Sequence, residues 1–289
     1  MFIRKVIALC LLLVPVCSST FVHANPLPPF GYPPFETVAI HANSNNKDYE
    51  LYIQLPKSYK DTKAHYPFII VNDTSFAFPI TNGAMALMGG AVVKEAIVVG
   101  ISYSKGDDRM VSRTRDYTPT FSPVDKNGNS STARMASGHA KEYVDFIERQ
   151  VIPLLKEKYR IDPKKSVFVG HSYGGLLGTY ILFKKPHLFT DYIIGSPSLW
   201  YDNRVMFTLE KAFSKVHSRL PANVTMFVGS LENDYYPMVT DLLAMEKQLR
   251  SRNYEGFSLR VEVLQGENHH SVFPGLLSKG LMATLSLEK

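Results

Sequence analysis

A serine set between glycines is the residue of this chain best suited to covalent chemistry. Residues 166–175 read SVFVGHSYGG, a short apolar strand pattern that runs into Gly-x-Ser-x-Gly and then into a helical pattern. A strand that turns this sharply into a helix holds its serine in a strained backbone conformation, and the glycines keep other side chains clear of it. The pattern predicts that Ser172 is a nucleophile that attacks carbonyl carbon. The alternative is a glycine-lined turn between a strand and a helix.

A serine hydroxyl is a weak nucleophile, so it needs a neighbouring base, and His269 is the predicted one. Residues 266–271 read GENHHS and follow the apolar strand pattern at 259–264. Where a nucleophile elbow is followed by a triad, the chain order is serine, acid, histidine, which puts the base after the last strand. His270 is the alternative base and is otherwise a solvated loop residue. A metal site is not favoured, because neither a His-Glu-x-x-His helix nor a cysteine ligand accompanies the two histidines.

The acid of such a triad is expected after the penultimate strand, where residues 229–234 read GSLEND. Glu232 is the predicted acid, and its role would be to hold the tautomer of the base and stabilise the imidazolium. Asp234 competes with it. If both acids are solvated, the serine and histidine would act as a dyad, with water or a backbone carbonyl in the third place.

Acyl transfer also needs donors directed at the developing oxyanion. The backbone N–H of Tyr173, next to the serine, is the first expected donor. The second is expected in the loop after the third strand, and residues 72–76, NDTSF, assign it to the backbone of Thr74. In that loop Asp73 has the alternative role of a strand-end cap.

The elements around these residues follow the order of an α/β-hydrolase. Two β-rich stretches open the chain, a polar hairpin signal at 43–48 separates them, and buried strands then alternate with amphipathic helices. The expected strands are 36–42, 49–55, 67–72, 96–103, 166–170, 192–196, 224–229 and 259–264, and the expected helices are 141–158, 174–184, 203–219, 238–252 and 273–287. The fold class is therefore α/β, with a mostly parallel eight-stranded sheet flanked by helices. Residues 109–137 fit neither pattern and are interpreted as a long loop with a function, the alternative being a disordered loop.

The N-terminus has the pattern of a secretory signal peptide. Two positive charges precede the apolar run 6–16, which is too short to span a bilayer, and 22–24 read VHA. Cleavage after Ala24 would leave one esterase domain, residues 25–289, in the periplasm or secreted. Both cysteines lie in the removed segment, so the mature chain would form no disulfide. Lipidation at Cys17 is the alternative, disfavoured by the valine that precedes it.

Composition limits the possible partners. Without Arg4 and Lys5 the chain has 30 basic and 26 acidic side chains, a net charge of about +4 against +6 for the whole sequence. The basic residues are scattered and form no stripe interleaved with aromatic residues, so a nucleic acid is not an expected partner. The expected partner is a small-molecule ester, with no cofactor, no metal and no membrane contact after signal cleavage. The sequence leaves the oligomeric state open.

Several motifs in the same order resemble the esterases of the esterase D type, and within them the branch of ferric-siderophore esterases. The motifs cover nearly the whole mature chain: GHSYGG at 170–175, RTRDYTPT at 113–120, SG at 137–138, SPSLW at 196–200 and GENH at 266–269. The resemblance implies that Ser172 is the nucleophile, that His269 is the base, and that Trp200 and the 113–120 stretch line or brace the cleft. Two departures affect the site walls, since the family often has glycine where this chain has Thr74 and where it has His270.

Three residues become candidates for substrate binding on this basis. Arg113 and Arg115 are candidates for a carboxylate or catecholate, the alternative for each being a salt bridge to Asp116 or another nearby acid. Trp200 is a candidate for stacking on an aryl group, the alternative being a place in the core.

The function expected is therefore an exported serine esterase that works through an acyl-enzyme. By resemblance, its substrate class is a siderophore lactone or a related aryl ester. The alternatives are an esterase for feruloyl or acetyl groups on polysaccharide, an acyltransferase, and a binding protein on a catalytically retired scaffold.

Overall fold

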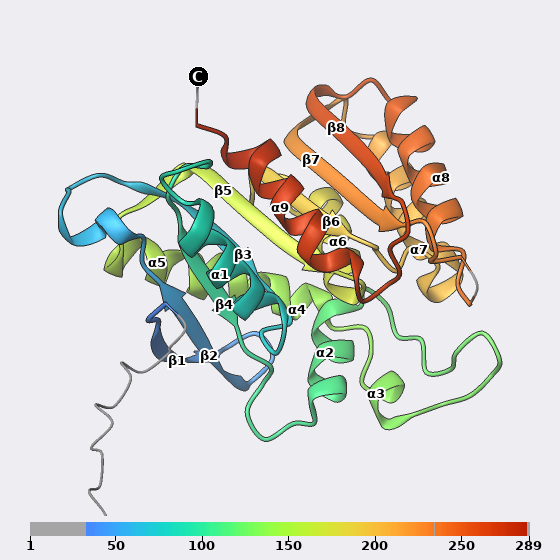
Figure 1. The fold of residues 1–289 in the computed structure, drawn as a ribbon. Helices are drawn as coiled ribbons and strands as arrows, with labels where there is room; N and C mark the ends of the chain where they lie inside the picture. The colour runs from blue at the N-terminus through green and yellow to red at the C-terminus, as the bar shows by residue number, and fades with distance from the viewer. Residues whose placement is uncertain (1–32, 234, 288–289) are drawn as a thin grey trace, which may run out of the picture. The chain divides into compact units, whose positions relative to one another are not determined.

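An eight-stranded mixed sheet organises the part of the chain that the computed structural model describes, residues 33–233 and 235–287 (Figure 1). The strand order is β1-β2-β4-β3-β5-β6-β7-β8. The strands are β1 Glu36–Ala42, β2 Lys47–Gln54, β3 Tyr66–Val71, β4 Ile97–Ile101, β5 Ile161–His171, β6 Asp191–Gly195, β7 Arg219–Gly229 and β8 Glu255–Leu264. This matches the predicted α/β class and the predicted number of strands.

Neighbouring strands from β4 to β8 are parallel, and the hairpin β1–β2 is antiparallel at the other end of the sheet. The central strands β3 to β6 are buried on both faces, which explains their nearly continuous apolar sequences. The predicted hairpin signal at 43–48 falls on the turn between β1 and β2. Because parallel strands end at the same edge, loops distant in sequence meet there.

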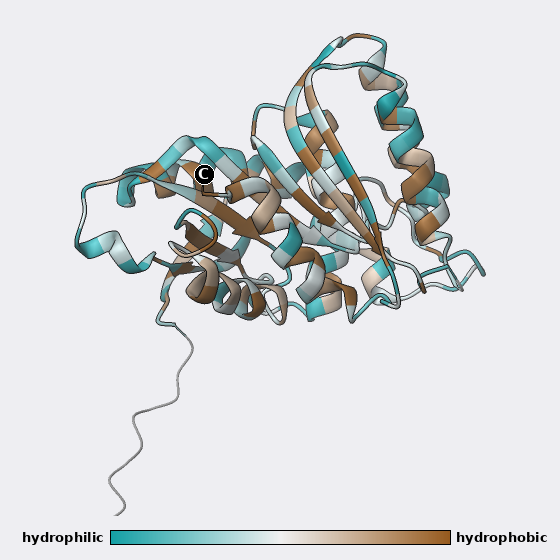
Figure 2. Cartoon of the chain, turned by 45° about the horizontal axis from the view of Figure 1, so that its top comes forward, coloured by the Kyte–Doolittle hydropathy of each residue, from teal (hydrophilic) through white to brown (hydrophobic). Residues whose placement is uncertain are grey.

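Helices cover both faces of the sheet. In Figure 1, α1 and α9 lie in front of the sheet, and Figure 2 shows the brown, apolar strands between the helical layers. One core joins α1 and α9 to side chains such as Val169 and Ile193, and the second joins the opposite face to α4–α8. The helices are α1 Ala77–Met88, α2 Arg109–Tyr117, α3 Thr132–Met135, α4 Ala140–Phe146, α5 Ile152–Lys158, α6 Tyr173–Lys184, α7 Tyr201–Ser214, α8 Met238–Arg250 and α9 Val272–Leu285, with a π-helical turn Ile147–Val151 between α4 and α5.

Two helices differ from the sequence expectation. Helix α1 was not predicted, because Pro79, Asn82 and Gly83 weaken its helical propensity and packing on the sheet has to supply its stability. Residues 109–137 were interpreted as a loop, but they begin as α2, whose N-cap Asp108 accepts hydrogen bonds from the N–H groups of the first turn. Helix α2 shows no apolar stripe because it buries ion pairs, as described below. None of the described helices is long and apolar enough to cross a membrane.

Backbone strain gathers at one edge of the sheet. Ser172 and Ser196 directly follow β5 and β6, and Asp73 is the second residue after β3; the φ angles of Asp73, Ser172 and Ser196 are 58°, 59° and 39°. A left-handed conformation costs roughly 1–3 kcal/mol for a residue with a side chain, and such residues cluster where a site is assembled. The carboxyl edge of the sheet is therefore the place to look for the site.

Candidate active site

Ser172 lies in the tight turn between β5 and α6, with φ 59° and ψ −117°. Its backbone is fixed on both sides, because its N–H donates to Gly195 O at 2.9 Å and its carbonyl accepts from Leu176 N at 2.9 Å. A side chain at Gly170 would place its Cβ 2.1 Å from Gly174 O, so this turn can close only with glycine at that position. The strand–turn–helix context predicted for the serine is confirmed.

His269 lies on the loop between β8 and α9, and its ring is held by a buried carboxylate. Its Nδ1 is 2.6 Å from Glu232 Oε2. The Glu232 side chain is 1% exposed and the His269 side chain is 35% exposed. With Nδ1–H bound in this way, the other ring nitrogen is left unprotonated and able to accept a proton.

Three donors converge on the Glu232 carboxylate. Besides His269, Ser196 Oγ donates to Oε1 at 2.7 Å and Gly229 N donates to Oε1 at 2.6 Å. Burial alone raises the pKa of Glu232, but these hydrogen bonds outweigh it and hold the pKa below its usual range. Glu232 is therefore a charged acceptor fixed in place, and the dyad arrangement left open by the sequence does not describe this geometry. Asp234, the competing acid, lies outside the described residues.

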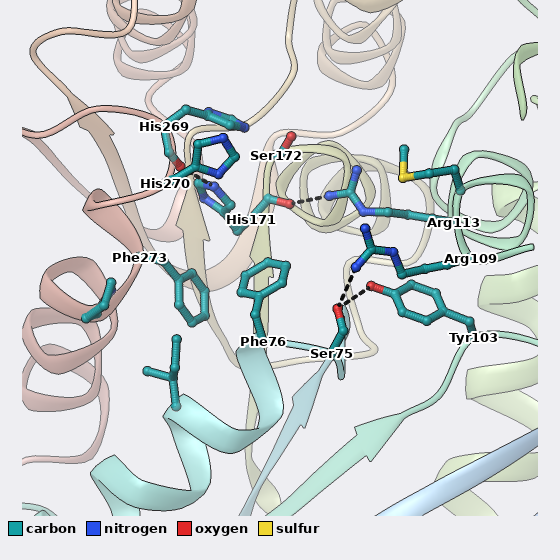
Figure 3. A pocket seen from close by; sticks show the side chains of 13 residues that line it. Ser75, Phe76, Tyr103, Arg109, Arg113, His171, Ser172, His269, His270 and Phe273 are labelled. Atoms are coloured by element: carbon teal, nitrogen blue, oxygen red, sulfur yellow. Dashed lines mark hydrogen bonds between the residues drawn. The ribbon is translucent and has the colours of Figure 1, made fainter. Parts of the chain in front are cut away.

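His171 holds the loop between β8 and α9 through a hydrogen bond to its backbone. Its Nε2–H donates to the carbonyl of His269 at 2.8 Å, and its ring packs edge-on against Phe273 (Figure 3). Burial, and next the neighbouring His269, lower the pKa of His171 to about 3. His171 therefore stays neutral, with its proton on Nε2. Because His171 directly precedes Ser172, this hydrogen bond links the serine turn to the backbone of His269.

The Ser172 hydroxyl has a second hydroxyl as its neighbour. Ser172 Oγ and Ser198 Oγ are 3.5 Å apart, and the buried Ser198 also donates its N–H to Ser172 O at 3.2 Å. Within residues 33–233 and 235–287, Ser172 Oγ makes no other hydrogen bond. Catalytic hydrogen bonds commonly tighten only when a substrate is bound.

The two expected oxyanion donors occupy different surroundings. Tyr173 is the first residue of α6, where a helix N–H has no carbonyl of its own helix to bind. Thr74 lies in the turn after β3, where the N–H groups of Phe76 and Ala77 donate to Asp73 O. The Thr74 methyl group points at Gly100, and a Cβ added there would be 2.9 Å from it. The role of both N–H groups stays a prediction.

Asp73 and Arg113 form a buried ion pair beside the serine. Arg113 Nε and Nη2 lie 2.7 and 2.9 Å from the two carboxylate oxygens, and Nη2 also donates to His171 O at 3.2 Å. Tyr103 donates to the same carboxylate at 2.9 Å. The Asp73 side chain is therefore an ion-pair partner rather than the strand-end cap considered above. Arg113 lines the cleft, but its charge is already neutralised.

Arg115 lies away from the cleft. It is buried on the opposite side of α2, with Nε 2.9 Å from Asp116 Oδ1 and Nη1 2.5 Å from Asp107 Oδ2. It does not line either cavity at Ser172. This corrects the expected substrate contact, because the alternative, a salt bridge to Asp116, is what the structure contains.

Two cavities meet at Ser172 and His269. The first lobe, of about 470 Å³, runs between α1, α2 and α9, and the second, of about 540 Å³, runs between α2, α3 and α8. Figure 3 shows the first lobe, with Phe76 and Phe273 on one wall and Arg113 on the other. Trp200 lines the second lobe and stacks on Tyr236, with ring centroids 3.6 Å apart and planes 2° apart. Trp200 is thus at the expected place for a substrate contact.

Some residues of the site were not predicted from the sequence. The sequence pattern assigns no role to Ser196 and Ser198, which belong to the SPSLW motif, and none to Tyr236. The serines follow β6, so the rule that strand ends converge at one edge could have identified them. Among residues 33–233 and 235–287, no three His, Cys, Asp or Glu side chains gather as metal ligands would.

Known proteins are similar to this chain in sequence and in fold. Ferri-bacillibactin esterase BesA of Bacillus subtilis (strain 168) is 28% identical over 264 residues, which cover 89% of this chain and 91% of that protein. The siderophore triacetylfusarinine C esterase of Aspergillus fumigatus is 24% identical over 269 residues, covering 83% of this chain and 89% of that protein. The crystal structure of an IroE-like serine hydrolase from Shewanella oneidensis matches the fold with a TM-score of 0.78, at 24% identity, covering 86% of this chain and 79% of that one.

The family model described as Putative esterase matches residues 42–284. That range runs from the end of β1 to α9, so it includes the serine turn, the glutamate after β7 and the histidine loop. This chain therefore belongs to the Putative esterase family, serine hydrolases that act on ester bonds, and its relatives include siderophore esterases.

Proposed function

We propose that this chain is an exported esterase that hydrolyses the ester bonds of a siderophore, through an acyl-enzyme on Ser172. The observation that carries the chemistry is the Nδ1–Oε2 contact of 2.6 Å between His269 and the buried Glu232, on the loops that flank the strained serine turn. The relatives named as siderophore esterases, which match over most of their length, support the substrate class.

In this mechanism His269 Nε2 takes the proton of Ser172 Oγ as the oxygen attacks the ester carbonyl. The N–H groups of Tyr173 and Thr74 stabilise the tetrahedral oxyanion. The imidazolium then protonates the leaving alcohol, and the acyl group stays on the serine. Water, deprotonated by His269, attacks the acyl-enzyme and releases the acid. Glu232 keeps the proton on Nδ1 throughout, which leaves Nε2 free to accept one.

The cleft has room for a substrate on both sides of the reacting bond. Lobes of about 470 and 540 Å³ each fall within the range of small-molecule sites, and Ser172 lines both. An ester whose acyl and alcohol parts are both bulky, as in a siderophore lactone, can therefore occupy both lobes at once.

The test compares a triscatecholate trilactone, with and without iron(III) as part of the substrate, with a short p-nitrophenyl ester. Faster cleavage of the trilactone by the wild type, lost in Ser172→Ala, is the expected result. Turnover of the simple ester alone would contradict the siderophore substrate and leave the esterase chemistry standing. No turnover of either would favour a binding protein.

Export is a separate part of the proposal and rests on the N-terminal sequence. The charged start, the apolar run and the VHA sequence support removal of residues 1–24. Mass spectrometry of the protein from cell fractions is expected to find a chain that begins at Asn25 in the periplasm or the medium. A chain that retains Met1 in the cytoplasm would contradict export.

A further inference from the structure

The charges of the cleft are distributed differently from the sequence expectation. Arg113 is neutralised by Asp73, and Arg115 is turned away into a buried ion-pair network. Two other arginines, Arg109 and Arg134, line the two lobes at Ser172, one in each.

Neither of these two arginines pairs with a carboxylate among residues 33–233 and 235–287. Arg109 Nη1 lies 3.4 Å from the Ser75 hydroxyl, and Arg134 Nη1 donates to the carbonyl of Val124 at 2.8 Å. Figure 3 shows Arg109 beside Ser75 in the first lobe. Each guanidinium therefore keeps its full charge and several N–H donors for another acceptor.

The carboxylates near the cleft leave these two charges available. Asp125 lies near Arg134, but it does not line the cleft and accepts from the N–H groups of Asn127 and Asn129. Glu232 is the carboxylate that lines the described part of the cleft, and this side chain is buried and bound to His269. Lys126 adds a further positive charge at the edge of the second lobe, with Nζ 3.6 Å from the centre of the Tyr235 ring. A cleft lined by one sign of charge attracts ligands of the opposite sign.

Each arginine stands next to apolar or aromatic walls. In the first lobe Arg109 shares the cavity with Phe76 and Phe273, and in the second Arg134 shares it with the stacked pair Trp200–Tyr236. Each lobe can therefore hold an apolar or aryl group that carries an anionic substituent.

We propose that Arg109 and Arg134 bind anionic groups on opposite sides of the scissile bond, so that the preferred substrate is an ester with a negative charge on both its acyl and its alcohol parts. This rests on the proposed esterase function and specifies its substrate. Both arginines are specificity residues, and hydrolysis of a neutral ester does not depend on them.

The test uses four esters that differ only in the number and position of their carboxyl groups: phenyl pentanoate, phenyl hydrogen adipate, and the 3-carboxyphenyl esters of the same two acids. For the wild type we expect each carboxylate to raise kcat/KM by about 10-fold, since hydrogen bonds to charged groups are the stronger ones. Arg109→Gln should lose that gain for a charge on one side of the ester and Arg134→Gln for a charge on the other. The exposed Arg149 lies outside both lobes, so Arg149→Gln is the matched control and should lose neither.

A binding measurement separates this inference from the esterase function. The anilide analogue of the doubly charged ester is titrated into Ser172→Ala, with quenching of Trp200, the single tryptophan, as the signal. The Kd is expected to rise about 10-fold when either arginine is also replaced. Binding is also expected to weaken at high salt. Equal loss against all four esters, or an unchanged Kd, would overturn the inference. Failure of the wild type to hydrolyse any ester, with the arginine dependence of binding intact, would overturn the esterase function alone.

Discussion

Replacing Glu232 by glutamine tests whether the third group of the site is needed. In the structure Oε1 accepts from Ser196 and Gly229, while Oε2 accepts from His269 Nδ1. A glutamine has one oxygen and one NH₂ group. If the oxygen keeps the two donors at Oε1, the NH₂ group faces Nδ1 and forces the proton of His269 onto Nε2. That tautomer cannot take the proton of Ser172.

The size of the effect follows from this tautomer and from burial. The Glu232 side chain is 1% exposed, so water cannot replace the lost acceptor. Removing the corresponding charge from a serine-protease triad lowers kcat by about 10⁴-fold. We therefore expect Glu232→Gln to lower kcat by about 10³–10⁴-fold, equivalent to roughly 4–5.5 kcal/mol of activation free energy.

The assay is kcat on a short p-nitrophenyl ester, together with the rate of labelling by a fluorophosphonate and the melting temperature. Glu267→Gln is the matched control, because Glu267 is a half-buried acid two residues before His269, does not line the cleft and accepts from Ser271 rather than from His269. The control should stay within about 2-fold of the wild type, since surface changes are usually small in effect. A loss of less than 10-fold in a folded Glu232→Gln would refute the reasoning and favour a dyad.

Three further outcomes follow from buried groups near the serine. Burial lowers the pKa of His171 to about 3 in the folded protein, whereas the unfolded chain binds this proton below about pH 6.5. The free energy of unfolding therefore decreases as the pH is lowered from about 6.5 towards 3. His171→Phe should flatten this fall by about 1.4 kcal/mol per pH unit in urea unfolding between pH 6.5 and 4, and an equal slope would contradict the assignment. Arg113→Met should destabilise the protein by about 3–5 kcal/mol because it leaves Asp73 charged and buried, and adding Asp73→Asn should recover part of the loss; additive losses in a double-mutant cycle would count against the pair. The free energy of unfolding of Ser172→Gly should be about 1 kcal/mol higher than that of Ser172→Ala, since glycine relieves the positive φ. Equal free energies would show that the turn stores no strain.

The sequence predicted those parts of the site that depend on strand order. Ser172, Glu232 and His269 each follow a strand of the parallel sheet, and parallel strands bring their carboxyl ends together at one edge. Their convergence could therefore be inferred without a structure. The eight strands were predicted for a similar reason, since buried parallel strands are continuous apolar runs.

Ion-pair partners could not be predicted in this way. Arg113 pairs with Asp73, which is 40 positions away in the sequence, and Arg115 pairs with its neighbour Asp116 and with Asp107. Which arginine stays unpaired in the cleft depends on how α2 is rotated against the sheet. The sequence does not reveal that rotation, since α2 buries mostly polar residues and therefore has no apolar stripe.

The segment between β4 and α4 contributes no strand to the sheet, yet it carries Arg109, Arg113 and Arg134 to the cleft. It is fastened to α7 by a small number of polar contacts, among them Thr120 Oγ1 to Asp202 at 2.5 Å. Arg113 ties the helical part of this segment to Asp73 and to the His171 carbonyl, so that part has to stay. Selection can instead remodel one wall of the cleft by exchanging residues 121–136, which carry Arg134, while the elbow and the histidine loop keep their supports. Grafting the corresponding stretch of another esterase onto this scaffold should transfer substrate preference separately from reactivity, which makes the segment a natural unit for diversification and for engineering.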